Sequence, residues 1–356
     1  MEEKKLYKGT QSINVRFREF REEDAPGFVE CIRDEYGETY LKRNYYHPEF
    51  LIHEHHSAHC KFLVAEVEGS VAAILALKRP FPGESICELG NATVRKKYRQ
   101  YGIMSQLNQY AIAEAKKQGG FSSLYAFVVA YQNISQRSLE RVGFRPCGFL
   151  LSTLSMEFFS HSFARDGNAK QHLGIMVRRE GQQDAGTVYV PAEHRERILE
   201  AYRSLGSSVR IGAEFFPLAG KSSCSAEYDT GQQSGTIWVE EAGEELEDCI
   251  REIEAGYSLP NWTFNVQLNI SDKKAVAAYR ELQKLGYFFA GVRPLCGSRE
   301  IMILHHPRDV QIDFDTMALS EGFAHWRDYV RQTAERLNRN GENGHQETGI
   351  VTDSLL

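Results

Sequence analysis

The stretch that decides the fold is "YRQYGIMSQL" (98–107), which follows the strand-like run "ICELGNATV" (86–94) and opens a helical pattern. Gly102 stands at the start of that helix, although glycine costs about 1 kcal/mol relative to alanine inside a helix. The first turn of a helix has unpaired N–H groups and a partial positive charge. A glycine lets an anion approach these amides without a Cβ in the way. The turn between strand 86–94 and Gly102 is therefore predicted to bind a phosphate.

The elements around this turn alternate in type. The patterns predict a strand, two helices, three strands, a helix, a strand, a helix and a strand, in an α/β domain over residues 1–160. The two strands joined through Glu68-Gly69-Ser70 have the pattern of a hairpin. The expected elements are strand 15–20, helices 21–36 and 47–57, strands 61–69, 70–80 and 86–94, helix 102–120, strand 122–130, helix 134–144 and strand 146–154.

This order, with "ERVGF" (140–144) closing the last helix, resembles the GNAT superfamily of acyl-CoA-dependent N-acyltransferases. The family signature is a strand ending in a hydrophobic residue, then R/Q-x-x-G-x-G/A at the start of the next helix. Here Val94 is followed five residues later by Arg99, and then by Gly102 and Met104. The resemblance implies an α/β (α+β) fold with a mixed, mostly antiparallel sheet flanked by helices. It also implies acetyl-CoA as co-substrate, with no metal.

The resemblance also implies which residues contact acyl-CoA. The backbone of Ala92, Thr93 and Val94 would pair with the pantetheine arm, and Asn133 and Ser135 would lie near the thioester. The pyrophosphate would rest on the turn and first helical residues, namely Arg99, Gln100, Tyr101, Gly102, Ile103, Met104 and Ser105.

The sequence departs from the family pattern at two positions. Met104 stands where the family has a small residue, so close approach of the pyrophosphate there relies on backbone direction alone. Leu139 stands where many members have a tyrosine that acts as general acid. The leaving thiolate would then take its proton from Tyr131 or from water, or would need no dedicated acid.

Transfer to an amine needs a base, because most amines are protonated at neutral pH. Glu88 lies six residues before Val94, the offset at which histone-type members of the family carry their base glutamate. We expect burial in the sheet to raise the pKa of Glu88 toward the useful range. The alternative is a glutamate in a salt bridge or at the wet edge of the strand.

The segment "HPEFLIHEHHSAHC" (47–60) holds five histidines and Cys60. The pairs His55/His59 and His56/Cys60 are four residues apart, which places each pair on one helix face and is compatible with zinc. A polar helix end is the favoured interpretation, because nothing completes a known zinc spacing. The family resemblance places this segment at the wall of the acceptor pocket.

The second half repeats part of the first. "LERVGFRPCG" (139–148) and "LQKLGYFFAG" (282–291) share Leu and G-[FY]-x-x-x-G at matching offsets. No matching phosphate turn is present, because "VEEAGEELEDC" (239–249) puts carboxylates where a phosphate would need bare amides. We therefore predict a second, degenerate GNAT-like domain. The expected division is 1–160, connecting strand and linker 161–186, second domain 187–310, helix 311–338 and disordered tail 339–356.

Composition narrows the class of protein. The net charge of −6 and a pI near 6.1 give no basic footprint for nucleic acid. The charged start "MEEKKLYKGT" has no apolar core of a signal peptide, and no run approaches the ~20 apolar residues of a membrane span. Seven scattered cysteines predict reduced thiols, mostly buried, in a cytoplasmic protein.

The second half also resembles the C-terminal region of certain bacterial proteins, which implies a bacterial origin.

The sequence favours an N-acetyltransferase that moves an acetyl group from acetyl-CoA to an amine of a small molecule or protein by direct attack in a ternary complex. Two alternatives remain open: a regulatory or adaptor protein that binds acyl-CoA without turnover, and an interaction protein that has lost coenzyme A. The acceptor is undetermined, and a homodimer is possible.

Overall fold

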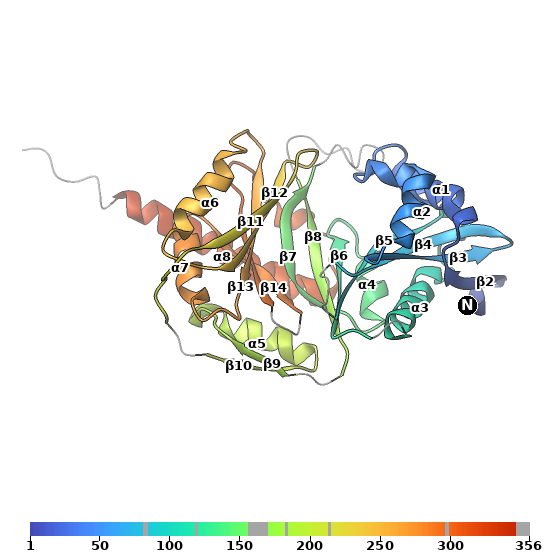
Figure 1. The fold of residues 1–356 in the computed structure, drawn as a ribbon, viewed down its shortest axis with the longest axis horizontal. Coiled ribbons are helices and arrows are strands. Elements are labelled where there is room, and N and C mark those ends of the chain that lie inside the picture. The colour runs from blue at the N-terminus through green and yellow to red at the C-terminus, as the bar shows by residue number, and fades with distance from the viewer. Residues whose placement is uncertain are drawn as a thin grey trace, which may run out of the picture.

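The computed structural model describes residues 1–80, 85–117, 120–155, 170–181, 184–212, 215–295 and 299–346. A mixed sheet of 13 strands runs through the molecule in the order β1-β2-β3-β4-β5-β6-β8-β7-β14-β15-β13-β12-β11, and β9 and β10 form a separate pair (Figure 1). We call residues 1–181 the first half and residues 184–346 the second half.

The first half contains eight strands and four α-helices within the described ranges. Its strands are β1 (Glu2–Lys8), β2 (Gln11–Glu19), β3 (Cys60–Val67), β4 (Ser70–Lys78), β5 (Ile86–Val94), β6 (Ser123–Val129), β7 (Arg145–Leu154) and β8 (Gln171–Arg179). Its helices are α1 (Ala25–Tyr36), α2 (Pro48–His56), α3 (Ile103–Lys117) and α4 (Ile134–Glu140).

The described part of the second half contains seven strands and four α-helices. Its strands are β9 (Asp184–Val188), β10 (Ser208–Ile211), β11 (Ser223–Asp229), β12 (Ser234–Glu241), β13 (Thr263–Asn269), β14 (Phe288–Pro294) and β15 (Glu300–His306). Its helices are α5 (Arg195–Ser204), α6 (Leu246–Ala255), α7 (Ala275–Lys284) and α8 (Glu321–Gln346).

Alternating residues of the first-half strands face two different helical layers. Phe62 and Ile74 belong to the core under α1 and α2, whereas Leu63 and Leu75 belong to the core that includes Leu107 of α3. Neighbouring residues of a strand point to opposite faces of a sheet. Helices therefore cover both faces, and every strand pair of the first half is antiparallel except β5–β6. The predicted fold class, a mostly antiparallel mixed sheet flanked by helices, is confirmed.

The strand β8 departs from the sequence-based division. The pattern around 172–180 indicated a connecting strand outside the first domain, but β8 pairs with both β6 and β7 and lies between them in the sheet. A boundary at residue 160 therefore removes a strand from the middle of the first-half sheet. Strand order follows long-range pairing, which a local pattern does not contain.

The second half repeats the strand arrangement of the first. The order β12-β13-β15-β14 matches β5-β6-β8-β7, and in each set only the first pair is parallel. The helices α6 and α7 follow β12 and β13 as α3 and α4 follow β5 and β6. The sequence repeat at 139–148 and 282–291 thus lies on the same helix-to-strand junction in both halves.

The two halves join at the last glycine of that repeat. Gly148 of β7 and Gly291 of β14 are register partners, with φ of 133° and 156°. A Cβ on Gly148 would stand 2.3 Å from the Cα of Gly291 and 2.5 Å from the carbonyl oxygen of Ala290. Each glycine also marks a register shift against its other neighbour, β8 or β15. The close backbone approach explains why both copies of the repeat end in glycine.

Replacing Gly148 by alanine is expected to lower the free energy of unfolding by about 2–3 kcal/mol, because the new methyl group meets backbone that has to move. Urea unfolding measures the loss. Gly186→Ala is the control, since Gly186 also has a positive φ of 79° but its Cβ would meet nothing within 4 Å. Equal losses in the two variants would contradict the role of the junction.

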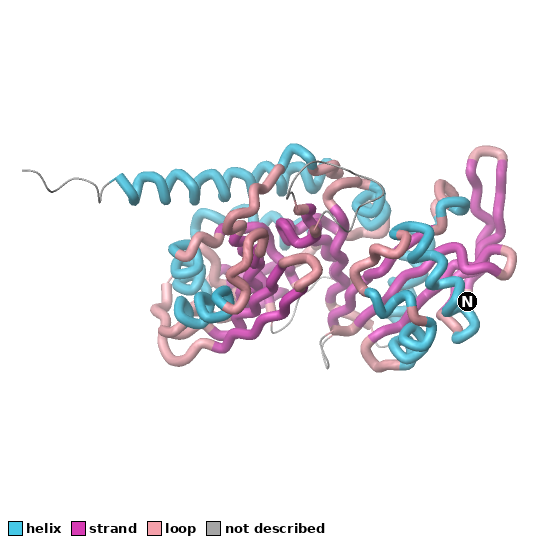
Figure 2. Tube along the Cα trace, turned by 90° about the horizontal axis from the view of Figure 1, so that it is seen from above, coloured by secondary structure: helices cyan, strands magenta, loops and turns pink. Residues whose placement is uncertain are grey.

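The helix α8 packs against both β7 and β14, where the two halves meet, and runs past them (Figure 2). Phe323, Trp326 and Val330 are buried, as predicted, and the indole N–H of Trp326 donates to the carbonyl of Pro146 at 2.9 Å. The helix continues to Gln346 rather than ending at residue 338, so the expected tail is helical over 339–346. The remainder, 347–356, lies outside the described residues.

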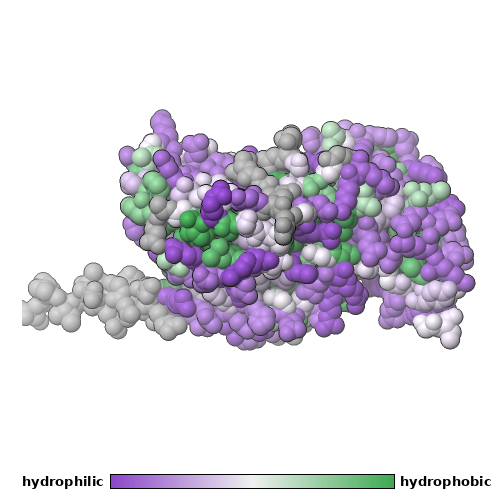
Figure 3. All heavy atoms as spheres, turned by 90° about the horizontal axis from the view of Figure 1, so that it is seen from below, coloured by the Kyte–Doolittle hydropathy of each residue, from purple (hydrophilic) through white to green (hydrophobic). Residues whose placement is uncertain are grey.

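The surface and the thiols agree with the composition. Among the helices in the described ranges, none is both long enough and apolar enough to cross a membrane. The face seen in Figure 3 is mostly hydrophilic, with hydrophobic residues gathered in small areas. The six described cysteines are free, and four of them are buried; Cys296 lies outside the described residues.

Candidate functional site

The parallel strands β5 and β6 pair only at one end. Their register covers Ile86↔Ser123 to Glu88↔Tyr125, after which β5 continues to Val94 with no strand of the described residues paired to it on that side. On the other side, two residues of β5, Asn91 and Ala92, lie opposite one residue of β4, and Asn91 has φ of 53°. This bulge turns the backbone of β5 beside the unpaired edge. An extended ligand would find free backbone groups there.

The loop from β5 to α3 presents its amides to open space. Gln100 and Gly102 have φ of 74° and 77°, and a Cβ on Gly102 would meet no atom within 4 Å. Within the described part of the chain, the N–H groups of residues 100–105 donate to no other residue. Left-handed residues beside a helix start turn successive N–H groups to one side, which forms an anion site. The loop at Gly102 therefore has free amides in the arrangement that the predicted anion site would need.

Arg99 holds this loop in place. Its Nε donates to the carbonyl of Val94 at 3.1 Å, which explains the five-residue step between them, and its guanidinium pairs with Glu35 of α1. The amide of Lys96 donates to the carboxylate of Asp34, also on α1. The contribution of Arg99 is therefore to brace the loop against α1 and β5.

The residues that follow Arg99 fix the start of α3. Ile103 is fully buried, and Met104 and Tyr101 are partly buried and pack against the core. The hydroxyl of Tyr101 donates to the side chain of Gln11 at 3.1 Å. Ser105 lies in the first turn and is partly buried. The Met104 side chain is thus in contact with the core of the protein.

Two buried hydroxyls lie at positions that the sequence predicted to be near acyl-CoA, one on β5 and one in the first turn of α4. Thr93 Oγ1 on β5 and Ser135 Oγ in the first turn of α4 are both buried without a hydrogen-bond partner among the described residues. Asn133 precedes α4, and its carbonyl accepts from the amide of Arg137 at 3.0 Å. Buried hydroxyls without partners are costly unless something else bonds to them. A polar ligand could supply the missing hydrogen bonds.

Glu88 lies in a row of side chains across three strands. Lys78 of β4 and Tyr125 of β6 are its register partners on either side. The Lys78 Nζ is 3.0 Å from Glu88 Oε1, and the Tyr125 hydroxyl donates to Oε2 at 3.2 Å. The carboxylate lies over Gly90, whose Cβ would stand 2.8 Å from Oε1.

The protonation of Glu88 differs from the expectation. Burial alone raises its pKa, but the charge and hydrogen bond of Lys78, the charge of Lys42 and the hydrogen bond from Tyr125 outweigh it, so the pKa lies below its usual value. The expectation of a raised pKa is wrong, because the cation opposite Glu88 belongs to another strand. Glu88 is ionised at neutral pH and is ready to accept a proton, although it is a weaker base than an isolated buried glutamate.

The two positions considered for the general acid, Tyr131 and Leu139, belong to different cores of the first half. Tyr131 follows β6 and packs partly buried against the core under α1 and α2, and burial raises the pKa of its hydroxyl. It therefore stays protonated at neutral pH. Leu139 is buried in the hydrophobic core and offers no polar group.

Sequence reasoning missed five polar residues on and around the strands next to Glu88. Lys78 and Tyr125 are its direct neighbours, and the Asn91 side chain donates to Tyr40 and accepts from the Tyr45 hydroxyl at 3.4 Å. Only the strand register could have placed Lys78 and Tyr125 beside Glu88. Asn91 carried a weak signal, because asparagine tolerates the left-handed backbone of a bulge.

The histidine segment has a structural use. His55 Nδ1 accepts from the amide of Phe62 at 3.0 Å, and burial lowers the pKa of His55 to about 4. His56 lies exposed beside Glu22, and His59 is exposed. Among the described residues, no group of three His, Cys, Asp or Glu side chains is placed to hold a metal ion. His55 thus joins α2 to β3.

In the second half, the turn after β12 corresponds to the β5–α3 loop, and its amides are hydrogen-bonded within the protein. The parallel strands β12 and β13 are paired over six residues, from Ser234↔Thr263 to Val239↔Leu268. Unlike β5 and β6, they remain paired over most of their length. In the following turn, the Gly243 and Glu244 amides donate to Ser222 Oγ and to the Gly220 carbonyl, both at 3.0 Å. A Cβ on Gly243 would stand 2.3 Å from that carbonyl oxygen. The amides that an anion would need are already bonded.

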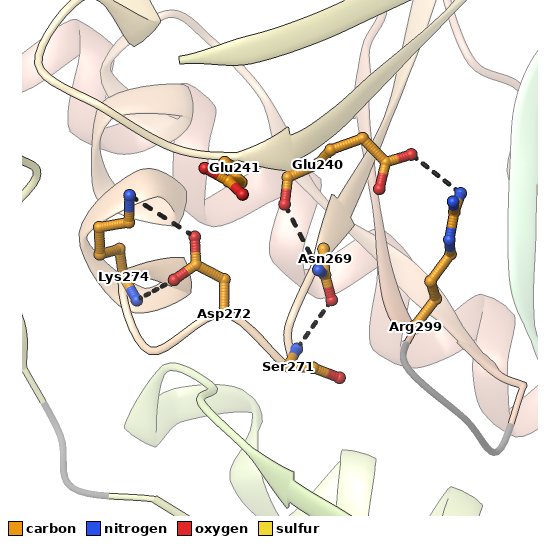
Figure 4. A pocket seen from close by; sticks show the side chains of 7 residues that line it. All are labelled: Glu240, Glu241, Asn269, Ser271, Asp272, Lys274 and Arg299. Carbon is orange, nitrogen blue, oxygen red and sulfur yellow. Dashed lines mark hydrogen bonds and ion pairs between the residues drawn. The ribbon is translucent and has the colours of Figure 1, made fainter. Parts of the chain in front are cut away.

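A cleft of about 550 Å³ lies beyond the ends of β12 and β13 (Figure 4). Arg299 pairs with Glu240 at 3.0 Å, and Lys274 lies 3.9 Å from Asp272. The lining has three carboxylates and two cations, so its net negative charge disfavours phosphate. The lining residues are Glu240, Glu241, Asn269, Ser271, Asp272, Lys274 and Arg299.

Comparison with known proteins gives one family. Residues 21–144 match the model of the acetyltransferase (GNAT) family. The solved structures that resemble the chain include an N-acetyltransferase from Staphylococcus aureus Mu50 (20% identity, TM-score 0.38, 46% of this chain and 97% of that one). They also include a ribosomal-protein-alanine N-acetyltransferase from Brucella melitensis (22% identity, TM-score 0.38, 46% and 99%). No curated protein matches the sequence.

Proposed function

We propose, on the premise that residues 21–144 form a domain of the GNAT acetyltransferase family, that this chain transfers an acyl group from acyl-coenzyme A to an amine. The observation that carries the proposal is the set of free amides at residues 100–105, beside the unpaired edge of β5. The finer proposal is an acetyl group, taken from acetyl-CoA and passed to an amine of a small molecule or protein.

The residues present fit acyl-CoA. The amides of Gln100 to Ser105 would bind the pyrophosphate, with Gly102 leaving its approach open. The backbone of Ala92, Thr93 and Val94 would pair with the pantetheine arm along the free edge of β5. The unpartnered hydroxyls of Thr93 and Ser135 support this path, and Asn133 lies beside Ser135 at the start of α4.

The chemistry is a direct attack in one ternary complex. Acyl-CoA supplies a thioester carbonyl with a thiolate leaving group. As the amine nitrogen bonds to the acyl carbon and the carbon–sulfur bond breaks, Glu88 accepts the proton of the amine, directly or through water. Tyr131 or water returns a proton to the thiolate. Free backbone N–H groups at the β5 bulge would polarise the carbonyl.

The second half is proposed as a degenerate copy of the same fold that does not bind coenzyme A. The repeated strand order, the glycine junction and the filled turn at Gly243 support this assignment. The first-half domain then extends through β8 to about residue 180, and the second from 184 into α8. Cytoplasmic location and bacterial origin, inferred from the sequence, belong to the same proposal.

Release of free thiol from acetyl-CoA, measured over a panel of primary amines, tests the proposal. We expect release that depends on the amine and increases with pH as the amine loses its proton. Binding of acetyl-CoA without amine-dependent thiol release would instead support the non-catalytic adaptor. The ion pair between Lys78 and Glu88 favours this second candidate, because it lowers the pKa of Glu88 and makes Glu88 a weaker base.

A further inference from the structure

A charged side chain of the second half is buried against the first half. Arg293 of β14 is 2% exposed, and its guanidinium carbon lies 4.9 Å from the ring centre of Tyr125, 5.3 Å from that of Trp238 and 6.0 Å from that of Phe127. Its Nη2 donates to the side chain of Gln267 at 2.6 Å. Tyr125 and Phe127 belong to β6, so Arg293 reaches the strand that borders Glu88.

The end of β14 is attached to β6 at this point. The hydroxyl of Ser123 donates to the carbonyl of Pro294, and the hydroxyl of Ser122 to that of Leu295, both at 3.4 Å. These contacts join segments that are more than 170 residues apart in sequence. The position of Arg293 over Tyr125 is therefore supported by the backbone on both sides of the contact.

The charge of Arg293 is paired directly with no carboxylate of the described residues. Guanidinium stays protonated in proteins, and burying a charge is costly unless it is compensated. Within the described part of the chain, its Nε also has no hydrogen-bond partner. The negative charge that Arg293 faces is Glu88, across Tyr125, whose hydroxyl donates to Glu88 at 3.2 Å.

We propose that Arg293 is a positioning residue for the acyl-transfer site: it holds Tyr125 in its hydrogen bond to Glu88 and stabilises the ionised carboxylate. This inference rests on the proposed function for its catalytic meaning. The second half then completes the site of the first half by supplying the cation behind Tyr125. It accounts for a buried arginine whose side-chain hydrogen bond, within the described ranges, goes to the neutral amide of Gln267. It also gives the second half a role other than binding coenzyme A.

The direct test is the titration of Glu88, followed by NMR of ¹³C-labelled glutamate carboxyls and assigned by loss of the signal in Glu88→Gln. Removing a nearby cation favours the neutral acid, so in Arg293→Met the midpoint should move to higher pH by about half a unit or more. Arg293→Lys keeps the charge and should move it less. A folded Arg293→Met protein with the wild-type midpoint would overturn the inference.

Arg308→Met is the matched control. Arg308 also lies over a ring, 5.7 Å from the centre of Phe264, and donates to the carbonyl of Tyr257 at 2.8 Å, both within the second half. Its loss should leave the midpoint unchanged. If Arg293→Met does not fold, Gln267→Met, which releases the guanidinium from its hydrogen bond, should shift the midpoint in the same direction. An unchanged midpoint in that variant overturns the inference as well.

A double-mutant cycle with Tyr125→Phe separates positioning from general destabilisation. If Arg293 acts through Tyr125, the double variant should shift the titration no further than the larger single shift. Additive shifts would contradict a shared path. The titration needs no acyl donor or turnover, so a missing thiol release would refute the proposed function while leaving the Arg293–Tyr125–Glu88 link tested on its own.

Discussion

Replacing Gly102 by aspartate is expected to weaken coenzyme A binding by at least about 100-fold. The variant side chain would project into space that is empty in the structure. Its carboxylate would then stand about 5 Å from a pyrophosphate resting on the amides of residues 100–105, a repulsion on the order of 3 kcal/mol near a surface. Aspartate tolerates a left-handed backbone better than most residues, so the fold should survive. Isothermal titration calorimetry with coenzyme A measures the effect.

Gly206→Asp is the matched control for this variant. Gly206 has φ of 68° against 77° at Gly102, and a Cβ there also meets nothing within 4 Å. Both variants bear the same backbone cost and gain the same charge, but Gly206 lies in the second half, after α5. Unchanged affinity in Gly102→Asp, or an equal loss in both variants, would show that the β5–α3 loop does not hold the pyrophosphate.

Replacing Glu88 by glutamine is expected to lower kcat by about 100- to 1,000-fold, the usual contribution of a positioned base. Affinity for coenzyme A should stay within about twofold, because Glu88 faces Lys78 and Tyr125 rather than the β5–α3 loop. Amine-dependent thiol release and calorimetry give the two quantities. Equal losses of turnover and affinity would count against Glu88 as the base.

Glu254→Gln supplies the control for the Glu88 variant. Glu254 accepts from the Tyr287 hydroxyl at 2.5 Å and lies 3.0 Å from His306, an arrangement like that of Glu88 with Tyr125 and Lys78. Its replacement disturbs a similar network in the second half, and turnover should be unaffected. A loss of turnover matching that of Glu88→Gln would mean that both act through stability.

The pH dependence follows from the lowered pKa of Glu88. In the folded protein, the pKa of Glu88 lies below the usual value for glutamate. Glu88 is therefore ionised at neutral pH, and it gains a proton only when the pH falls through this lowered pKa. Glu88 should therefore contribute no change in kcat between pH 6 and 8. Deprotonation of the amine acceptor should dominate in that range, so a rate that rises with pH is expected.

Local sequence patterns were sufficient to predict the features that depend only on residues close together in the chain. The spacing of Val94, Arg99 and Gly102 predicted the loop, because helix starts and left-handed turns depend on neighbouring residues. The structure adds why the spacing is five residues: the Arg99 guanidinium spans the loop to the Val94 carbonyl. The helix starts and the hairpin at Glu68-Gly69-Ser70 were predicted for the same reason.

The environment of Glu88 was not predictable in this way. Lys78 and Tyr125 become its neighbours only through the register of three strands, and a shift of one residue would place their side chains on the other face. Burial alone gave the wrong direction for the pKa of Glu88. Likewise, β8 reads locally as a connecting strand, and only its pairing with β6 and β7 places it inside the sheet.

The internal repeat was visible in sequence, but its meaning was not. The matching glycines predicted a duplicated junction, whereas their direct contact at Gly148 and Gly291 required the structure. The same holds for the turn at Gly243. Its carboxylates suggested that phosphate is excluded, and the structure adds that Gly220 and Ser222 occupy its amides.

Calorimetric titration of the unmodified chain with coenzyme A tests the central claim most directly. The free amides at 100–105 and the bonded amides at 243–244 predict saturable binding of one coenzyme A per chain. Absence of binding heat would contradict the anion site after β5. Two molecules per chain would contradict the assignment of the second half as a fold that has lost the site.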